Sequence, residues 1–305
     1  MSQLCLSGFI RAIQHKNLRV RGIEVWQHGE KVAEHRWAPD YRYPVHSISK
    51  SFTSAAVGMA IEDGLFGLKD PVLKYFPEYA PKDPDNAFHR LTVWNLLTMS
   101  TGHVCDSALR PEQGPDEDDG VRQFFSIPLE TEPGAFFCYD GGATYMLSAL
   151  LQQTTGQRVQ DYLKPRLFDP LGIENVVWDT CPKGRNLGRS GLYLKTSELG
   201  KLGRLYLQKG VWEGRQLVPA DWVAESGKAQ MDNSTETAAD NVFGYGYKFW
   251  RCSVNAYRAD GYLGQFAIIA DDLDAVIAVS SWEPNAQAIL TTLWATVWPQ
   301  LEQGV

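Results

Sequence analysis

The spacing of apolar residues in the first part of the chain changes from a β to a helical period. Residues 18–26 and 31–37 alternate between apolar and polar positions on either side of a short polar break, which is typical of a β-hairpin. Residues 1–17 have the spacing of an amphipathic helix, and apolar side chains at 47–63 recur at helical spacing until the stop signal Gly64. The pattern therefore predicts helix, hairpin, helix.

The middle of the chain is rich in predicted helices, and the last part returns to strands. Predicted helices are 92–99, 121–125, 144–155, 197–208, 219–227 and 290–301, separated by Pro- and Gly-containing loops. A polar loop, residues 228–241, comes before the late strands. Predicted strands are 246–251, 256–258, 264–270 and 275–280, with a hairpin turn at 271–274.

This order of elements predicts an α+β fold, in which an antiparallel sheet is flanked by helices and a helical lobe is inserted between early and late strands. No linker, low-complexity tract or fixed-period repeat divides the chain. We therefore expect a single domain, residues 1–305. Its α/β lobe would comprise about residues 1–65 and 186–305, and its helical lobe about residues 66–185.

Composition narrows the class of protein. With 305 residues, of which 44% are hydrophobic, the chain can bury a large core without help from metals. The net charge is -7, and the densest charged run, residues 116–119, is acidic and expected to be a solvated loop, which argues against a nucleic-acid partner. No stretch predicts a membrane span or a signal peptide, and the five cysteines are widely spaced. We expect a cytoplasmic protein.

Candidate chemistry begins at the start of the 47–63 helix. Ser47 and Lys50 are three positions apart, so a helix places the hydroxyl and the amine on one face. A serine hydroxyl needs a base to become a nucleophile, and a lysine among apolar neighbours is suitable because desolvation favours its neutral form. Backbone N–H groups at the helix N-terminus would lie near the reacting carbonyl. The same spacing also fits a helix cap followed by a solvated lysine.

Other catalytic arrangements find no support in the sequence. The chain has no Gly-x-Ser-x-Gly elbow and no histidine after His103, which excludes a Ser/His/Asp triad on an α/β-hydrolase sheet. His46 is next to Ser47 but would point elsewhere on a helix, and His89 and His103 lack partners at metal-ligand spacing. We expect no metal and no cofactor.

Five further landmarks occur in a fixed order along the chain. They are HSISKSFTS (46–54) with EDGL (62–65) and DPV (70–72), LTVWNLLTMSTGH (91–103), PGAFFCY (133–139), GLYLKTSEL (191–199) and GYLGQ (261–265). In this order they resemble the landmarks of the penicillin-binding-protein and β-lactamase superfamily, and of class C β-lactamase-type serine hydrolases in particular. That group includes esterases and 6-aminohexanoate-dimer-hydrolase-like enzymes.

The resemblance implies roles for three side chains. Ser47 would be the nucleophile and Lys50 its partner. Tyr139 would be the second catalytic residue, acting as general base during acylation and as acid toward the leaving group. A tyrosine in that role needs a nearby cation that lowers its pKa, and Lys50 is the obvious candidate.

The resemblance also implies the groups that bind the substrate. The backbone N–H groups of Ser47 and Tyr262 would form the oxyanion hole. The strand that carries GYLGQ would bind the substrate through Asp260, Gly261 and Gln265.

Two departures from the family's pattern bear on the substrate. The tyrosine motif is often Tyr-x-Asn, whereas Gly141 takes the asparagine's place here. The third motif is commonly Lys-Thr-Gly or His-x-Gly, whereas residues 259–261 read Ala-Asp-Gly and offer no cation for the carboxylate of a β-lactam. Arg258 would lie on the opposite face of the strand from Ala259. Efficient β-lactam hydrolysis is therefore not expected.

The sequence thus favours a hydrolase for small ester or amide substrates that are neutral or apolar on the acyl side. Alternatives within the same chemistry are a D-amino-acid peptidase, an amide-oligomer hydrolase, a weak β-lactamase and an acyltransferase. An alternative of another class is a catalytically silent member that binds a ligand. The sequence leaves the oligomeric state open.

Overall fold

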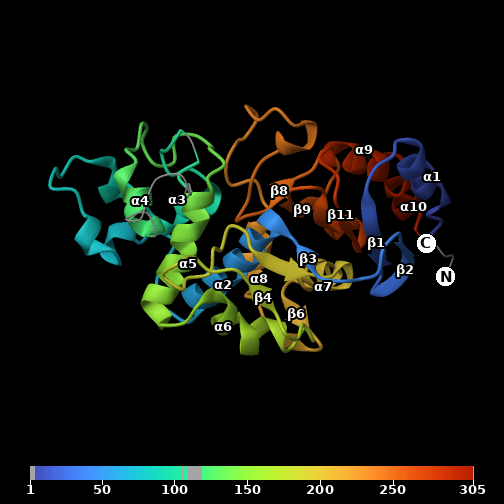
Figure 1. Ribbon diagram of the computed structural model, residues 1–305, viewed down its shortest axis with the longest axis horizontal. Coiled ribbons are helices and arrows are strands. Elements are labelled where there is room, and N and C mark those ends of the chain that lie inside the picture. Colours follow the sequence, from blue (N-terminus) through green and yellow to red (C-terminus); the bar gives the residue numbers. More distant parts are fainter. Residues whose placement is uncertain (1–3, 105, 109–118, 305) are drawn as a thin grey trace.

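The computed structural model describes residues 4–104, 106–108 and 119–304, so most of the acidic run at 116–119 lies outside the described residues. At its centre is a six-stranded antiparallel sheet with the strand order β2-β1-β11-β10-β9-β8. The strands are β1 (Val20–Gln27), β2 (Glu30–Arg36), β8 (Trp250–Arg251), β9 (Tyr257–Gly261), β10 (Gln265–Ala270) and β11 (Ala275–Ser281). Because β1 pairs with β11, the first and last parts of the chain are neighbours (Figure 1).

The two predicted hairpins are present in the sheet. β1 pairs with β2, and β10 pairs with β11 in a register that sets Ile268 opposite Ile277. The turn of the second hairpin is a short 3-10 segment, Asp271–Leu273, followed by Asp274 with φ 45°. Asp and Asn tolerate this left-handed conformation better than other side chains do, which explains the acidic turn.

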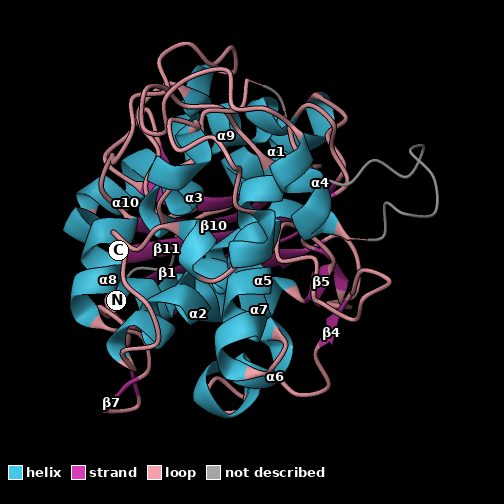
Figure 2. Ribbon diagram, turned by 90° about the vertical axis from the view of Figure 1, so that its left-hand side faces the viewer, coloured by secondary structure: helices cyan, strands magenta, loops and turns pink. Residues whose placement is uncertain are grey.

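Helices cover both faces of the sheet (Figure 2). On one face, Ile23 and Val25 of β1 pack into a core shared with α1 (Ser7–His15), α9 (Ala286–Thr296) and α10 (Trp298–Gln303). On the other face, α7 (Thr196–Leu207) packs against β1, β10 and β11. Side chains alternate between the two faces of a strand, so a sheet covered on both sides carries apolar residues at consecutive positions, as β11 does.

The helix α2 (Ser49–Glu62) packs against the helical part of the molecule through α5 and α6. Every residue from Ser49 to Ala60 is buried. The helix is therefore buried on all sides over this stretch, where the sequence predicted an apolar stripe on one face. The other helices of this part, on the left of Figure 1, are α3 (Val93–Thr98), α4 (Gly120–Ser126), α5 (Gly141–Thr155) and α6 (Val159–Leu163).

Shorter elements complete the fold. Two small sheets are formed by β3 (Tyr43–Pro44), β5 (Leu192–Leu194) and β4 (Val177–Trp178), and by β6 (Val211–Trp212) and β7 (Arg215–Gln216). A short helix, α8 (Ala220–Ser226), comes before the polar loop. None of the helices in the described ranges has the length and apolar character that crossing a membrane requires. The α+β prediction is confirmed.

Two predicted elements differ from the structure. The strand predicted at 246–251 is reduced to β8, because residues 246–249 turn back on themselves and Lys248 has φ 67°. The helix predicted at 290–301 is two helices, α9 and α10. Pro299 has no N–H to continue the hydrogen bonding of α9, and the chain bends at Val297.

Candidate active site

Ser47 lies in a 3-10 turn, His46–Ile48, and the α-helix α2 begins two residues later at Ser49. The turn is entered through His46, whose φ of 49° is uncommon for a residue with a side chain. Strained conformations of this kind persist where the surrounding structure holds them, and they cluster at functional sites. Ser47 is thus presented at the N-terminal end of a buried helix.

Lys50 lies one turn after Ser47 and points back toward it. Its Nζ is 2.9 Å from Ser47 Oγ and 3.0 Å from the backbone oxygen of Arg189. Burial is the main cause that lowers the pKa of Lys50 to about 7, and the nearby Arg189 guanidinium contributes to this lowering. At neutral pH, much of the Lys50 amine is therefore unprotonated and able to accept a proton.

Tyr139 reaches the same point from the loop before α5. Lys50 Nζ lies 4.9 Å from the centre of the Tyr139 ring, and the phenol is hydrogen-bonded to Ser47. Burial raises the pKa of Tyr139 above its ordinary value, and the hydrogen bond with Ser47 offsets only part of this. The expected lowering of the Tyr139 pKa is therefore wrong in direction. Tyr139 is therefore a protonated phenol at neutral pH, which leaves Lys50 as the candidate base.

Asp140 fixes the loop that carries Tyr139. Its buried carboxylate caps α5 by accepting a hydrogen bond from Gly142 N (2.8 Å), and it also accepts from Ser107 N and Oγ. Burial acts to raise the pKa of Asp140, but hydrogen bonds from His103 and Ser107 outweigh it and keep that pKa low. Asp140 was not predicted as a functional residue, although an aspartate just before a predicted helix is a typical cap.

Gly141 leaves no room for the asparagine side chain of the family's tyrosine motif. A Cβ atom at Gly141 would lie 2.9 Å from Arg189 Cδ and 3.2 Å from Asp106 Oδ1. The Gly141 N–H donates to Asp106 Oδ1 over 2.8 Å. Arg189 and Asp106 therefore occupy the space that an asparagine would need.

The strand β9 brings Asp260 and Gly261 to the nucleophile. A Cβ atom at Gly261 would lie 2.2 Å from the backbone oxygen of Val45, so only glycine permits this close approach to the nucleophile turn. Asp260 Oδ2 accepts a hydrogen bond from Arg258 Nε over 2.7 Å. Arg258 lies on the face opposite Ala259, as expected from the strand period, and is completely buried.

A pocket of about 240 Å³ contains Ser47 in its wall. It is lined by Ser47, Tyr139, Glu236, Asn241, Trp250, Asp260 and Tyr262. The pocket thus joins Ser47 with Tyr262, the two residues expected to supply the oxyanion hole, and it includes Asp260. Gly261 and Gln265 are not in its wall, and the Gln265 side chain instead hydrogen-bonds to backbone atoms of Leu263 and Ser281.

Three residues of this wall were missed in the sequence. Trp250 stacks on Tyr139, with ring centres 5.3 Å apart, while Glu236 and Asn241 come from the polar loop 228–241. Burial raises the pKa of Glu236. No local signal marks Glu236 or Asn241, because an irregular loop has no period from which a side-chain direction can be predicted.

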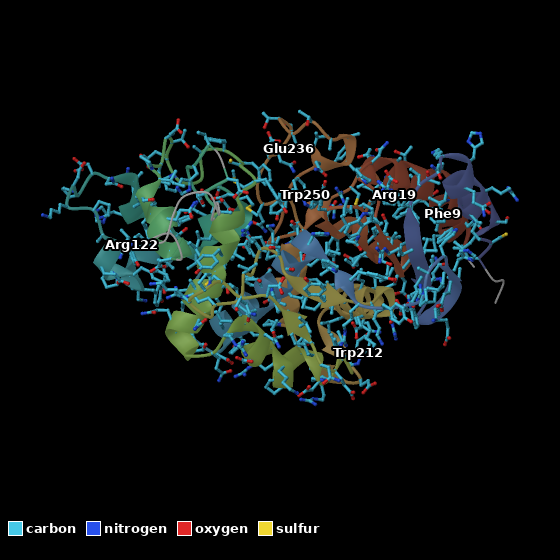
Figure 3. The ribbon with its side chains drawn as sticks, viewed as in Figure 1. Phe9, Arg19, Arg122, Trp212, Glu236 and Trp250 are labelled. Carbon is cyan, nitrogen blue, oxygen red and sulfur yellow. The ribbon has the colours of Figure 1, made fainter. Side chains whose placement is uncertain are left out.

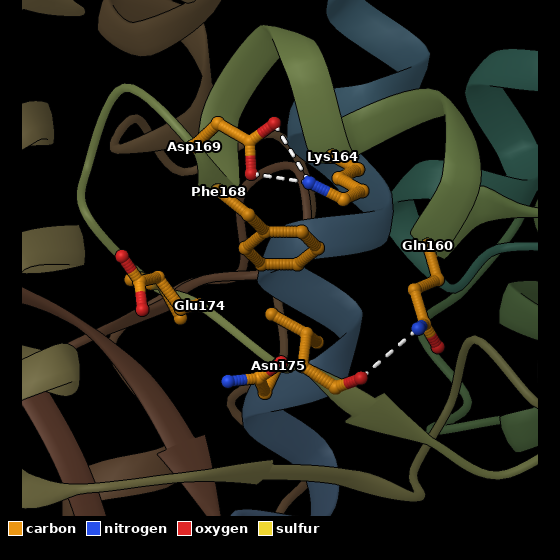
Figure 4. A pocket seen from close by; sticks show the side chains of 8 residues that line it. Gln160, Lys164, Phe168, Asp169, Glu174 and Asn175 are labelled. Atoms are coloured by element: carbon orange, nitrogen blue, oxygen red, sulfur yellow. Dashed lines mark hydrogen bonds and ion pairs between the residues drawn. The ribbon is translucent and has the colours of Figure 1, made fainter.

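A larger pocket, of about 620 Å³, lies between α6 and β4 and has none of these residues in its wall (Figure 4). Lys164 and Asp169 in its wall form an ion pair with an Nζ–Oδ1 distance of 2.7 Å. Within residues 4–104, 106–108 and 119–304, no three His, Cys, Asp or Glu side chains cluster as metal ligands would. The candidate active site is therefore the smaller pocket, around Ser47.

Comparisons with known proteins show which family the chain resembles in sequence and fold. The model of the Beta-lactamase family matches residues 11–292. The 6-aminohexanoate-dimer hydrolase of Paenarthrobacter ureafaciens is 25% identical over 271 residues, which are 81% of this chain and 68% of that protein. The lovastatin esterase of Penicillium rubens is 28% identical over 186 residues, 54% of this chain and 46% of that protein. The chain therefore spans about two thirds of the first relative and less than half of the second.

A solved structure supports the fold. The putative beta-lactamase from Bacteroides dorei DSM 17855 superposes with a TM-score of 0.78 at 17% identity, covering 96% of this chain and 98% of that one. At this level of identity the likeness concerns the fold alone. With the family model matching most of the sequence, the chain belongs to the Beta-lactamase family.

Proposed function

We propose that the chain is a serine hydrolase that cleaves small esters or amides through an acyl-enzyme on Ser47. The observation that carries this proposal is the 2.9 Å distance between Lys50 Nζ and Ser47 Oγ, with Lys50 buried and its pKa lowered to about 7. A nucleophile next to an unprotonated base is the arrangement that acyl transfer requires. A silent ligand-binding protein would have no need of this pair.

In the first half of the proposed reaction, Ser47 Oγ attacks the carbonyl carbon and its proton passes to the Lys50 amine. The tetrahedral oxyanion accepts hydrogen bonds from the backbone N–H groups of Ser47 and Tyr262, and the N-terminal end of α2 favours its negative charge. When the bond to the leaving group breaks, the Tyr139 hydroxyl gives its proton to that group and receives one from Lys50. The products of this half are the acyl-enzyme and the free alcohol or amine.

The second half repeats these steps with water. Water attacks the acyl carbonyl and loses a proton to Lys50, and Ser47 leaves with a proton from the same pair. Because the pocket of about 240 Å³ is small, substrates of modest size fit the site best. β-Lactams are disfavoured, because Ala259 takes the position of the motif's cation, the carboxylate of Asp260 lies in the pocket wall, and Arg258 is buried.

Turnover of p-nitrophenyl butyrate tests this proposal. The wild type is expected to release p-nitrophenol catalytically, and Ser47→Ala is expected to lose at least about 10³-fold in kcat/KM, because the acyl-enzyme cannot form. Ser197→Ala, at the start of α7 and outside the pocket, is the matched serine control and should keep wild-type turnover. Equal turnover by wild type and Ser47→Ala would contradict the proposal.

A further inference from the structure

The wall of the Ser47 pocket carries two carboxylates. Glu236, in the loop between α8 and β8, forms no ion pair or side-chain hydrogen bond with any other described residue, and Figure 3 shows it in the same region as Trp250. Asp260 is 23% exposed and only its Oδ2 atom is used by Arg258. Both carboxylates can therefore contact a substrate.

The positive charge nearest to these carboxylates is turned inward. Only 1% of the Arg258 side chain is exposed, and its NH1 and NH2 atoms donate to the backbone oxygen of Asp240 and to Asn241 Oδ1. The pKa of Asp260 is raised mainly by burial, and the buried carboxylate of Asp240 adds negative charge that raises it further. With Lys50 only partly protonated at neutral pH, the three carboxylates outweigh the Arg258 guanidinium, and this side of the pocket has an excess of negative charge.

Aromatic rings complete the same wall. Trp250 stacks on Tyr139, and Tyr262, with 65% of its surface exposed, also lines the pocket. The faces of Trp and Tyr rings attract cations. A pocket that combines the Glu236 carboxylate and the second oxygen of Asp260 with aromatic rings has the chemistry that binds an ammonium group.

We infer that the pocket selects substrates that carry a positive charge, as an ammonium or quaternary ammonium group, close to the scissile carbonyl. Glu236 and Asp260 would balance the charge, and Trp250 and Tyr262 would contact the alkyl groups around the nitrogen. A partly desolvated carboxylate without a partner is costly, and a bound cation removes that cost. The inference rests on the proposed hydrolase function and replaces the expectation of a neutral or apolar acyl group.

Two pairs of esters, each differing only in charge, test the inference. For a cation on the leaving group, butyrylcholine, the butyrate ester of choline, is compared with 3,3-dimethylbutyl butyrate. For a cation on the acyl group, p-nitrophenyl 4-(trimethylammonio)butyrate is compared with p-nitrophenyl 5,5-dimethylhexanoate. In at least one pair, kcat/KM for the charged ester should be about tenfold higher or more at low salt, and the ratio should fall as salt is added.

The variant Glu236→Gln tests whether the preference for charged esters comes from this wall of the pocket. The substitution keeps the shape and removes the charge, so the charged-to-neutral ratio should fall severalfold. Glu174→Gln, an exposed glutamate in the wall of the larger pocket, is the matched control and should keep the wild-type ratio. A wild-type ratio in Glu236→Gln would overturn the assignment.

The two proposals fail in different ways. Turnover of the neutral esters without any preference for the charged partner in either pair would overturn the inference and leave the hydrolase standing. Absence of turnover for all four esters, together with no labelling of Ser47 by a fluorophosphonate, would overturn the hydrolase and the inference with it.

Discussion

Lys50 is the residue on which the proposed chemistry depends. Only 4% of the surface of Lys50 is exposed, and its amine contacts the Ser47 hydroxyl. Burial is the main cause of its lowered pKa. The sequence suggested this state correctly, because the segment after Lys50 is apolar and a buried lysine favours its neutral form. The sequence could not reveal the further effect of Arg189, which is distant in the chain.

The pH dependence of kcat/KM should therefore follow Lys50. Its folded-state pKa is lowered to about 7, so the amine is protonated and inactive below that pH and neutral and active above it. With p-nitrophenyl butyrate, kcat/KM should rise with pH, reach half its maximum near pH 7 and then level off. A profile that is flat through neutrality would show that Lys50 is not the base, and one that rises only in the range of an ordinary lysine would show that the pKa of Lys50 is not lowered.

Tyr139 is expected to transfer protons without forming a stable phenolate. Tyr139→Phe removes the hydroxyl and keeps the ring that stacks on Trp250. Turnover should fall about 10²- to 10⁴-fold, as is usual when a general acid is lost. Circular dichroism and the melting temperature should stay close to those of the wild type. Retention of full turnover would assign the proton transfer to Lys50 alone.

The N-terminus of α5 is the element that places Tyr139. Asp140 caps this helix and also binds Ser107 and His103, so one side chain joins the helix to the loop at residues 103–108, of which residue 105 is not described. Asp140→Ala should lower the free energy of unfolding by about 2–4 kcal/mol, because the cap is lost and buried donors are left without acceptors. Urea unfolding followed by fluorescence measures this loss.

Asp161→Ala is the matched control for that variant. Asp161 lies in the first turn of α6 and pairs with Arg158, and both side chains are largely exposed. An exposed pair contributes little, so the loss should stay below about 1 kcal/mol. Similar losses for the two variants would mean that the Asp140 network does not stabilise the loop.

Helices and hairpins were easier to predict from the sequence than turns and loops. The hairpin at 271–274 and the helix after Ser47 have a clear period, and both are present. Aromatic residues at 246–251 predict a strand, but residues 246–249 form a turn. The left-handed conformation of Lys248 in this turn depends on tertiary contacts, which the local pattern does not show. Glu236 was missed for a related reason, since it lies in an irregular loop.

At the scale of the whole molecule, the pocket is assembled from distant parts of the chain. Ser47 comes from the early segment, Tyr139 from the helical part, and Trp250 and Asp260 from the late strands. The sheet makes this possible because β1 pairs with β11 and so brings the two ends of the chain together (Figure 1). Sequence landmarks could name Ser47, Lys50 and Tyr139, but not the charge of the wall around them.

The most direct test of the central claim is intact-mass spectrometry after incubation with a fluorophosphonate. Ser47 Oγ should displace fluoride from phosphorus and form one phosphonyl ester, so the wild type should gain the mass of one adduct. Ser47→Ala should gain none, and Ser197→Ala should gain one. An adduct that persists in Ser47→Ala, or a wild type that stays unlabelled, would contradict the assignment of Ser47 as the nucleophile.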